Sequence, residues 1–234
     1  MRKNHYSVIL TALTIFSIYG TFAGSNEQVP KLFQISPLQE VLEFMHSGNS
    51  ILFNLSVGFL VSLFFWWLLV YMPQEKKRQI LRTNLINRYK YFRLSIIQIF
   101  LFACQGSYES EQPEKLLNNE TFKKFFKDNE SKNWYAVLNG LEDRPNWVQE
   151  ILVEMEIFSK EIDYVLNNAD IQDEKVHSFF KNFESHIYKL NKSPTYSGDQ
   201  VKYLGNFLWE ILAHWSWVEG YRKNDVVQDM IHSI

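Results

Sequence analysis

The stretch Ile51–Met72, ILFNLSVGFLVSLFFWWLLVYM, constrains this chain more than any other part of it, because it contains no charged side chain. As a helix that rises about 1.5 Å per residue, it is long enough to cross the roughly 30 Å hydrocarbon core of a bilayer. The residues PQEKKR follow directly, and Pro73 is a place where the helix would stop or kink. We therefore expect a transmembrane helix over 51–72.

The N-terminal residues 1–23 have the pattern of a signal peptide. Two cations precede a short apolar run at 7–19, and small residues at 21 and 23 have the spacing of a cleavage site. This pattern favours removal of the segment after Ala23. An uncleaved first transmembrane helix over the same residues, forming a hairpin with 51–72, is the alternative.

Under either alternative, 24–50 is a short extracytoplasmic segment, too small to form a domain of its own. It carries a helix signal, because Ser36 and Pro37 suit the N-cap and the first helical position, and Gln39 completes a capping box. Apolar residues then recur at helical spacing as far as Met45. The segment is predicted to hold an amphipathic helix that lies on the membrane surface.

A basic juxtamembrane neck helix is predicted over 73–104. Its cations, with no acidic residue among them, are Lys76, Lys77, Arg78, Arg82, Arg88, Lys90 and Arg93. By the positive-inside rule this excess places the C-terminal body in the cytoplasm. The seven cations are also the predicted contacts to anionic lipid headgroups, each contributing about 1 kcal/mol near the surface.

The second half of the neck, LSIIQIFLFAC, is almost wholly apolar but too short to span a bilayer. It suits either a buried helix of the body or an amphipathic element on lipid. We expect a division, with the basic half at the lipid and the apolar half in the core. Apolar residues from Ile80 to Phe100 are expected to share one broad face of the neck helix.

Residues 105–234 form an acidic body, with 14 Lys and Arg against 22 Asp and Glu, although the whole chain has a net charge of only −2. An acidic body argues against nucleic acid as a partner, because phosphate binding needs clustered cations. Apolar residues recur throughout at helical spacing, and no alternating strand pattern is present. The predicted fold class is all-α: a cytoplasmic antiparallel helical bundle attached to its membrane helix.

Several helix boundaries of the body are visible in its sequence. Pro145 suits a helix start, and 167–173 is expected to be a turn that ends in a capping Asp173. Residues Ser197–Gln200 form a capping box that opens a long last helix through position 221. A final short helix is expected over 224–234.

The best candidate for chemistry lies on that last long helix. Glu210, His214, Trp217 and Tyr221 follow each other at spacings that place them on one helical stripe. A carboxylate one turn before a histidine can orient its imidazole or share a metal ion, and it is equally an ordinary helical pair. No motif of a known catalytic or metal site occurs, so no cofactor and no metal ligand is predicted.

Within the apolar span, Gly58 and Ser62 form a pair of small residues four positions apart. Such a pair lets two transmembrane helices approach closely. It is a candidate helix–helix contact in the membrane.

These features favour a membrane-anchored cytoplasmic module that binds or senses a protein partner, as an adaptor, signalling protein or complex subunit. This hypothesis predicts an exposed apolar or acidic patch on the body. A membrane-associated enzyme using Glu210 and His214 is the alternative, and it predicts that these two converge in a pocket, with His177 or His186 as further candidates. A subunit of an oligomeric membrane assembly, including a homo-oligomer, is a third.

Overall fold

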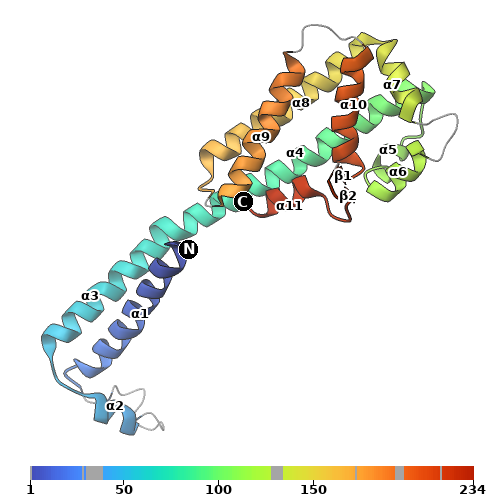
Figure 1. Cartoon of the computed structure of the whole chain (residues 1–234). Helices are drawn as coiled ribbons and strands as arrows, with labels where there is room; N and C mark the ends of the chain where they lie inside the picture. Colours follow the sequence, from blue (N-terminus) through green and yellow to red (C-terminus); the bar gives the residue numbers. More distant parts are fainter. Residues whose placement is uncertain are drawn as a thin grey trace. The chain divides into compact units, whose positions relative to one another are not determined.

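The computed structural model describes residues 2–27, 29, 39–127, 134–171, 173–192, 198–216 and 218–234, with the backbone alone for 2–7 and 198–200. This described part of the chain is mostly helical (Figure 1). It divides into two compact units, Met1–Lys76 and Lys77–Ile234.

The described residues of the first unit include α1 (Arg2–Ala23), α2 (Gln39–Met45) and α3 (Ser50–Trp66). Helix α2 confirms a short helix ahead of the apolar span, although its predicted start at 36–38 lies outside the described residues. Asn49 caps α3, because its side-chain oxygen accepts the backbone N–H groups of Ile51 and Leu52 at 3.1 and 3.2 Å.

Helical structure is continuous from Ser50 to Gln105, through α3, a π-helical turn η2 (Trp67–Tyr71) and α4 (Met72–Gln105). Among the described residues, this run contains the one helix that is long and apolar enough to cross a membrane. Of the two alternatives at Pro73, a stop or a kink, the stop is wrong, because helical structure continues through this residue. A proline ring crowds the carbonyl four residues before it, and the wider turn of η2, where Met72 N–H bonds the carbonyl of Trp67, lies directly before Pro73 and relieves that crowding.

Small residues hold α1 against α3. Ser17 and Gly20 of α1 and Ser56 of α3 are buried, whereas the large apolar side chains of α1 from Val8 to Tyr19 are exposed. A Cβ atom added at Gly20 would collide with the Ser56 hydroxyl and lie 3.2 Å from Leu52 Cδ1. This contact therefore requires glycine.

We expect Gly20→Ile to weaken the packing of α1 on α3 by about 1–3 kcal/mol, because the added side chain overfills a contact that has no room. Gly58→Ile is the matched control, since a Cβ atom at Gly58 meets nothing within 4 Å. Hydrogen exchange of the Ser47 and Gly48 amides, both of which donate to Ala23 O, reports the packing. Equal exchange in the two variants would contradict the role of Gly20.

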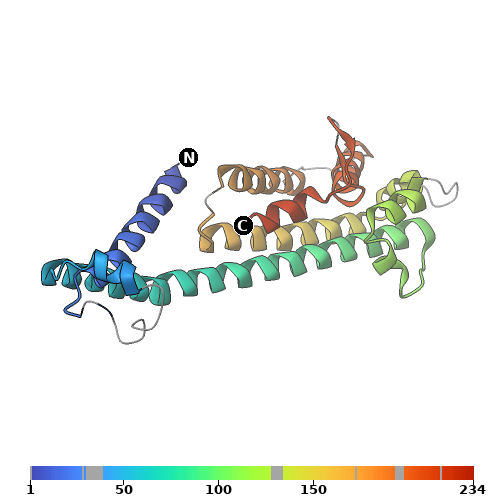
Figure 2. The ribbon, with the colours of Figure 1, turned by 90° about the horizontal axis from the view of Figure 1, so that it is seen from below.

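The second unit is built on α4. The remaining elements are α5 (Gln112–Lys115), α6 (Asn119–Lys127), α7 (Trp134–Glu142), α8 (Pro145–Asn168), α9 (Glu174–Asn191), α10 (Gly198–Leu212), β1 (Trp215–Ser216), β2 (Gly220–Tyr221) and α11 (Val226–His232). Helices α4 and α8 lie side by side (Figure 2). They run in opposite directions, because Lys77 meets Asn168 whereas Arg88 meets Glu154.

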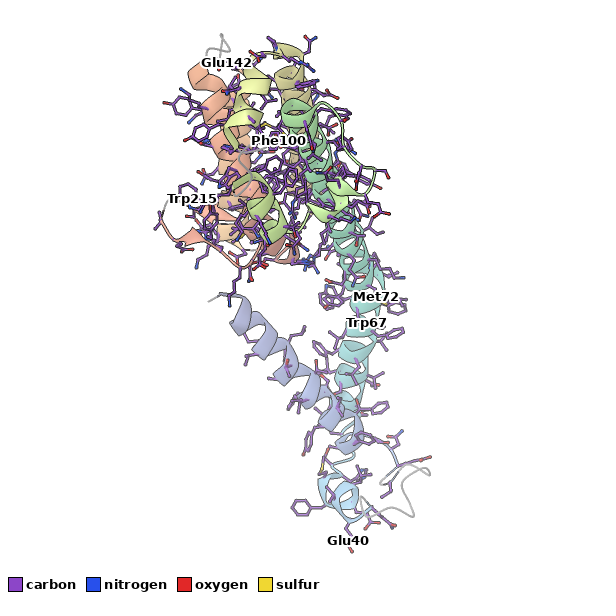
Figure 3. All side chains as sticks on the ribbon, turned by 90° about the vertical axis from the view of Figure 1, so that its right-hand side faces the viewer. Glu40, Trp67, Met72, Phe100, Glu142 and Trp215 are labelled. Atoms are coloured by element: carbon purple, nitrogen blue, oxygen red, sulfur yellow. The ribbon has the colours of Figure 1, made fainter. Side chains whose placement is uncertain are left out.

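The core of this unit is aromatic. Phe92 of α4 and Phe158 of α8 stack with ring centroids 5.1 Å apart, and the Tyr89 ring lies 5.5 Å from Phe158. Phe100, seen among the packed side chains in Figure 3, contacts the rings of Phe126 and Trp134 edge-on. The many Phe and Trp residues of the sequence thus form a core that α4 shares with the helices that follow it.

Several boundary predictions are confirmed. Helix α8 has Pro145 at its first position, α11 lies within 224–234, and the Asp173 carboxylate caps α9 by accepting the Lys175 N–H at 2.8 Å. The capping box at 197–200 lies outside the described side chains.

The predicted long last helix is wrong beyond Leu212, and the fold is not purely helical. His214 adopts a left-handed backbone conformation with φ +52°, which ends the helical path. Strands β1 and β2 then pair antiparallel, Trp215 opposite Tyr221. Gly220, with φ +72°, supplies the second left-handed residue that this tight hairpin uses.

The expected division of the neck is half correct. The apolar half of α4 is buried, from Ile96 to Leu101. The basic half also enters the core, through Leu81, Leu85 and Tyr89, so it belongs to the second unit rather than to a separate neck. Ile80 was expected on this apolar face but is 61% exposed.

Candidate functional site

A buried polar cluster brings together α4, the end of α10 and the start of α11. The Asp225 carboxylate accepts hydrogen bonds from Tyr89 Oη, at 3.0 Å to Oδ1 and 2.9 Å to Oδ2, and from Arg93 Nη1 at 3.1 Å. His214 Nε2 lies 3.3 Å from Asp225 Oδ2. The carboxylate also caps α11 by accepting the Gln228 N–H at 3.1 Å.

Arg93 extends the cluster further, because its Nη2 donates to the backbone carbonyl of Leu117, between α5 and α6. Arg93 is only 8% exposed. It is therefore bonded inside the body, and the prediction that it contacts lipid headgroups is wrong. Its charge is balanced by Asp225, which is the arrangement that a buried cation needs.

The electrostatics of the cluster fix its protonation. Burial raises the pKa of the Asp225 carboxyl, but the His214 contact and the charge of Arg93 together lower it by more, so this pKa lies below its usual value. Burial and then the charge of Asp225 raise the pKa of the Tyr89 phenol well above its usual value. At neutral pH, Tyr89 is therefore a hydrogen-bond donor to an ionised Asp225.

Glu210 and His214, the predicted catalytic pair, line the same small cavity of about 150 Å³, with Asp225 and Arg222. They no longer share a helix, since α10 ends between them. His177 and His186 do not line this cavity, and His186 stacks on Phe207 instead, with ring centroids 5.2 Å apart. The cavity therefore brings Glu210 and His214 together, and neither His177 nor His186 is among its lining residues. Trp217, also placed on this stripe, lies outside the described residues.

The Asp225 carboxylate at the cavity beside His214 has its partners inside the body. No group of three His, Cys, Asp or Glu side chains among the described residues could hold a metal ion. His214 is 9% exposed, and its ring faces a carboxylate that already binds Tyr89 and Arg93. The geometry is that of a cross-link between distant parts of the chain.

The other predicted lipid contacts are distributed unevenly. Lys76, Lys77 and Lys90 are exposed, whereas Arg78, Arg82 and Arg88 are half-buried. Arg78 bonds the carbonyl of Asp170 at 3.3 Å, and Arg88 Nη2 lies 3.4 Å from Glu154 Oε2. Some of the basic residues thus attach α4 to α8.

In the span, Gly58 and Ser62 are exposed, and the Ser62 hydroxyl donates to the Gly58 carbonyl at 2.8 Å. The small-residue contact within this chain uses Gly20 and Ser56 instead.

A groove between α4 and α8 is the second candidate site. Its volume is about 380 Å³, and its lining is Ser95, Gln98, Ile99 and Phe102 from α4 with Trp147, Glu150 and Glu154 from α8. Phe102 is 42% exposed, and Ile157 farther along α8 is 41% exposed. The groove therefore combines uncovered apolar surface with carboxylates.

Sequence reasoning missed the roles of Tyr89, Arg93 and Asp225. For Asp225 a signal existed, because an aspartate three residues before Gln228 is a helix-start pattern. For Arg93 there was none, since its partner lies 132 positions away. The groove was missed because helical periodicity does not show which two exposed faces become neighbours. Comparison of the chain with protein-family models, with curated proteins and with solved structures finds no match.

Proposed function

We propose that this protein is a membrane-tethered adaptor, in which the apolar helix anchors a cytoplasmic helical body that binds a protein partner. The observation that carries the proposal is the groove between α4 and α8. Exposed aromatic and aliphatic side chains beside carboxylates are typical of a surface that another protein covers. In the buried polar cluster, by contrast, the charged side chains of Arg93 and Asp225 pair with each other.

The anchor in this proposal is a hairpin of α1 and α3. Ala23 is buried, and its carbonyl accepts the backbone N–H groups of Ser47 and Gly48 at 2.6 and 3.1 Å and the Ser47 hydroxyl at 3.0 Å. A protease cleaves exposed, extended backbone more readily than a buried helix end. Retention of α1 is therefore the better supported of the two alternatives for 1–23.

Retention of α1 predicts that protein purified from native membranes carries residues 1–23. Intact-mass measurement of the chain tagged at its C-terminus checks this directly. A chain that begins at Gly24 would show cleavage and would leave α3 as the single membrane helix.

The orientation follows from the excess of cations after the span. The exposed cations Lys76, Lys77 and Lys90 are proposed to contact anionic lipid. The half-buried Arg82 is also proposed to contact lipid headgroups. Arg78 and Arg88 are proposed to do so through the part of each side chain that remains exposed.

The adaptor function is tested by a photo-crosslinking residue at Gln98 of the full-length protein in native membranes. We expect one stoichiometric partner adduct, because Gln98 lines the groove. The same residue at Tyr203, which is 68% exposed on α10, is the positional control. Phe102→Glu is expected to abolish the Gln98 adduct. Equal adducts from both positions, or none from Gln98, would reject the groove as a partner site.

A further inference from the structure

A pocket in the second unit lies where α6, α7, α10 and the hairpin of β1 and β2 meet (Figure 1). Its volume is about 420 Å³, which is within the range of pockets that hold small ligands. Most of its lining is aromatic: Phe126, Trp134, Tyr135, Trp209, Trp215 and Tyr221. We infer that this pocket binds a small molecule with a flat aromatic ring and an anionic group. None of its lining residues lines the groove between α4 and α8, so the inference is independent of the adaptor proposal.

The inner wall of the pocket belongs to the packed core. Trp134 of α7 and Trp209 of α10 have ring centroids 4.8 Å apart, and the fully buried Phe126 meets Trp134 edge-on at 6.1 Å. The ring of Phe122, also fully buried, lies 5.6 Å from that of Trp209. A wall that the core already holds in place loses little conformational freedom when a ligand stacks on it.

The outer rim of the pocket is uncovered. Tyr135 is 73% exposed and Tyr221 is 44% exposed. Trp215 pairs with Tyr221 across the hairpin, so the chain that follows α10 brings both of these rings to the pocket. A flat aromatic ring covers such a surface by stacking on it, either offset or edge-on.

Charge decides which aromatic molecule fits. In the part of the lining that the structure describes, Lys127 is the one charged side chain, and its Nζ lies 5.6 Å from the centre of the Tyr221 ring. Lys123, one turn earlier on α6, has its Nζ 4.7 Å from the same centre. Two ammonium groups therefore lie at the Tyr221 end of the pocket, where they pair with a carboxylate or a phosphate of the ligand.

The same lysines argue against a cationic ligand. An aromatic cage binds a quaternary ammonium group through open ring faces, whereas lysine ammonium groups already lie over the face of Tyr221. A third positive charge would be repelled by both. Asn206, the remaining lining residue, supplies an amide that can donate to the anion or hydrogen-bond a ring nitrogen.

The test measures the binding of probes that share a naphthalene ring to the full-length protein in phosphatidylcholine nanodiscs. Empty nanodiscs correct for partition into lipid. The probes are naphthoate, the neutral naphthylmethanol and the cationic naphthylmethylammonium. Because two lysines face the anion, we expect naphthoate to bind one-to-one and about tenfold more tightly than either of the others. Naphthyl phosphate, measured in the same way, shows whether the pocket prefers a phosphate or a carboxylate.

A charge variant tests recognition of the anion. Lys127→Gln is expected to weaken naphthoate about fivefold and to leave naphthylmethanol unchanged, because only the anion pairs with the ammonium group. Lys175→Gln is the matched control, since Lys175 is exposed on α9 and is not a lining residue. It is expected to change either affinity less than about twofold, because solvent and salt screen a distant exposed charge.

A ring variant tests stacking separately from charge. Tyr135→Ala is expected to weaken naphthoate and naphthylmethanol by the same factor, about threefold, because both lose one aromatic wall. Tyr164→Ala is the matched control, since Tyr164 is 53% exposed on α8 and does not line the pocket. Both affinities are expected to stay unchanged in that variant.

Hydrogen exchange locates the bound probe. The Arg222 N–H, which donates to the His214 carbonyl at 2.8 Å beside the hairpin, is expected to exchange more slowly when naphthoate binds. Equal affinities for naphthoate and naphthylmethanol, an unchanged naphthoate affinity in Lys127→Gln, or protection confined to α4 and α8 would overturn the inference.

Discussion

Phe158→Ala is expected to lower the free energy of unfolding of the body by about 3–5 kcal/mol, enough to unfold a marginally stable domain. Phe158 is fully buried, and its ring stacks on Tyr89 and Phe92 from α4 and meets Phe183 from α9 edge-on at 5.8 Å. Removing it leaves a cavity where three helices meet. Urea unfolding of the full-length protein in nanodiscs, followed by tryptophan fluorescence, measures the loss.

Phe102→Ala is the matched control, because it deletes the same side chain from a position that is 42% exposed. Its effect on unfolding is expected to be below about 1.5 kcal/mol, since little apolar surface returns to water. Phe158→Leu is expected to fall between the two. A loss below about 1 kcal/mol for Phe158→Ala would mean that the ring stack does not hold α8 and α9 to α4.

These two phenylalanines also show how far the sequence predicts the fold. The stripe of α8 was readable because buried positions recur along one helical face, and Phe158 lies on it. The same rule placed Ile80 on the apolar face of the neck, yet it is exposed. Hydrophobic periodicity identifies the apolar face of a helix. How much of that face is buried depends on which other helices pack against it, and a single sequence does not specify this.

Charge was less informative than periodicity. Arg93 and Lys90 were predicted as one class, because both are cations close to the span. The structure separates them: Lys90 is exposed and Arg93 is bonded to Asp225. Residues three apart on a helix lie on neighbouring parts of one face, so spacing did not separate the two cations. Only the fold shows that a carboxylate lies beside Arg93.

Glycine was ambiguous for the same reason. Gly58 and Gly20 both lie in apolar helices, and only Gly58, with Ser62, was proposed as a contact. The contact within this chain uses Gly20, whose added Cβ would collide with Ser56. Likewise, the helical stripe was predicted to continue through His214, but His214 has a left-handed backbone conformation and the helix ends before it. No glycine or proline at that position indicated the end of the helix.

Asp225→Ala is expected to destabilise the body by about 3–5 kcal/mol at pH 7, because it leaves the buried Arg93 charge without a partner. Asp225→Asn keeps the Oδ1 acceptor that caps α11, and it replaces Oδ2, which accepts from Arg93 Nη1, by an NH2 donor, so it removes the charge together with that hydrogen bond. Asp229→Asn, an exposed acidic residue on the same helix, is the control and is expected to cost less than about 1 kcal/mol. Urea unfolding curves supply all three values.

The effect of Asp225→Asn should depend on pH with a definite sign. The pKa of Asp225 is lowered in the folded protein, so its ionised form contributes stability above the unfolded-state pKa of about 3.9. That contribution is lost as the pH falls from there through the folded-state pKa. The difference in unfolding free energy between wild type and Asp225→Asn is therefore expected to be constant from pH 7 to 5 and to shrink below about pH 4.

A double variant separates this cluster from simple packing. Arg93→Met together with Asp225→Asn removes both charges, and it is expected to be more stable than Asp225→Asn alone, because no buried cation remains unpaired. If the double variant is instead less stable by the sum of the two single losses, the two side chains act independently and the cross-link is not electrostatic. If the difference between wild type and Asp225→Asn persists unchanged below pH 4, it does not come from the charge of Asp225, and the charge of Arg93 is balanced in another way.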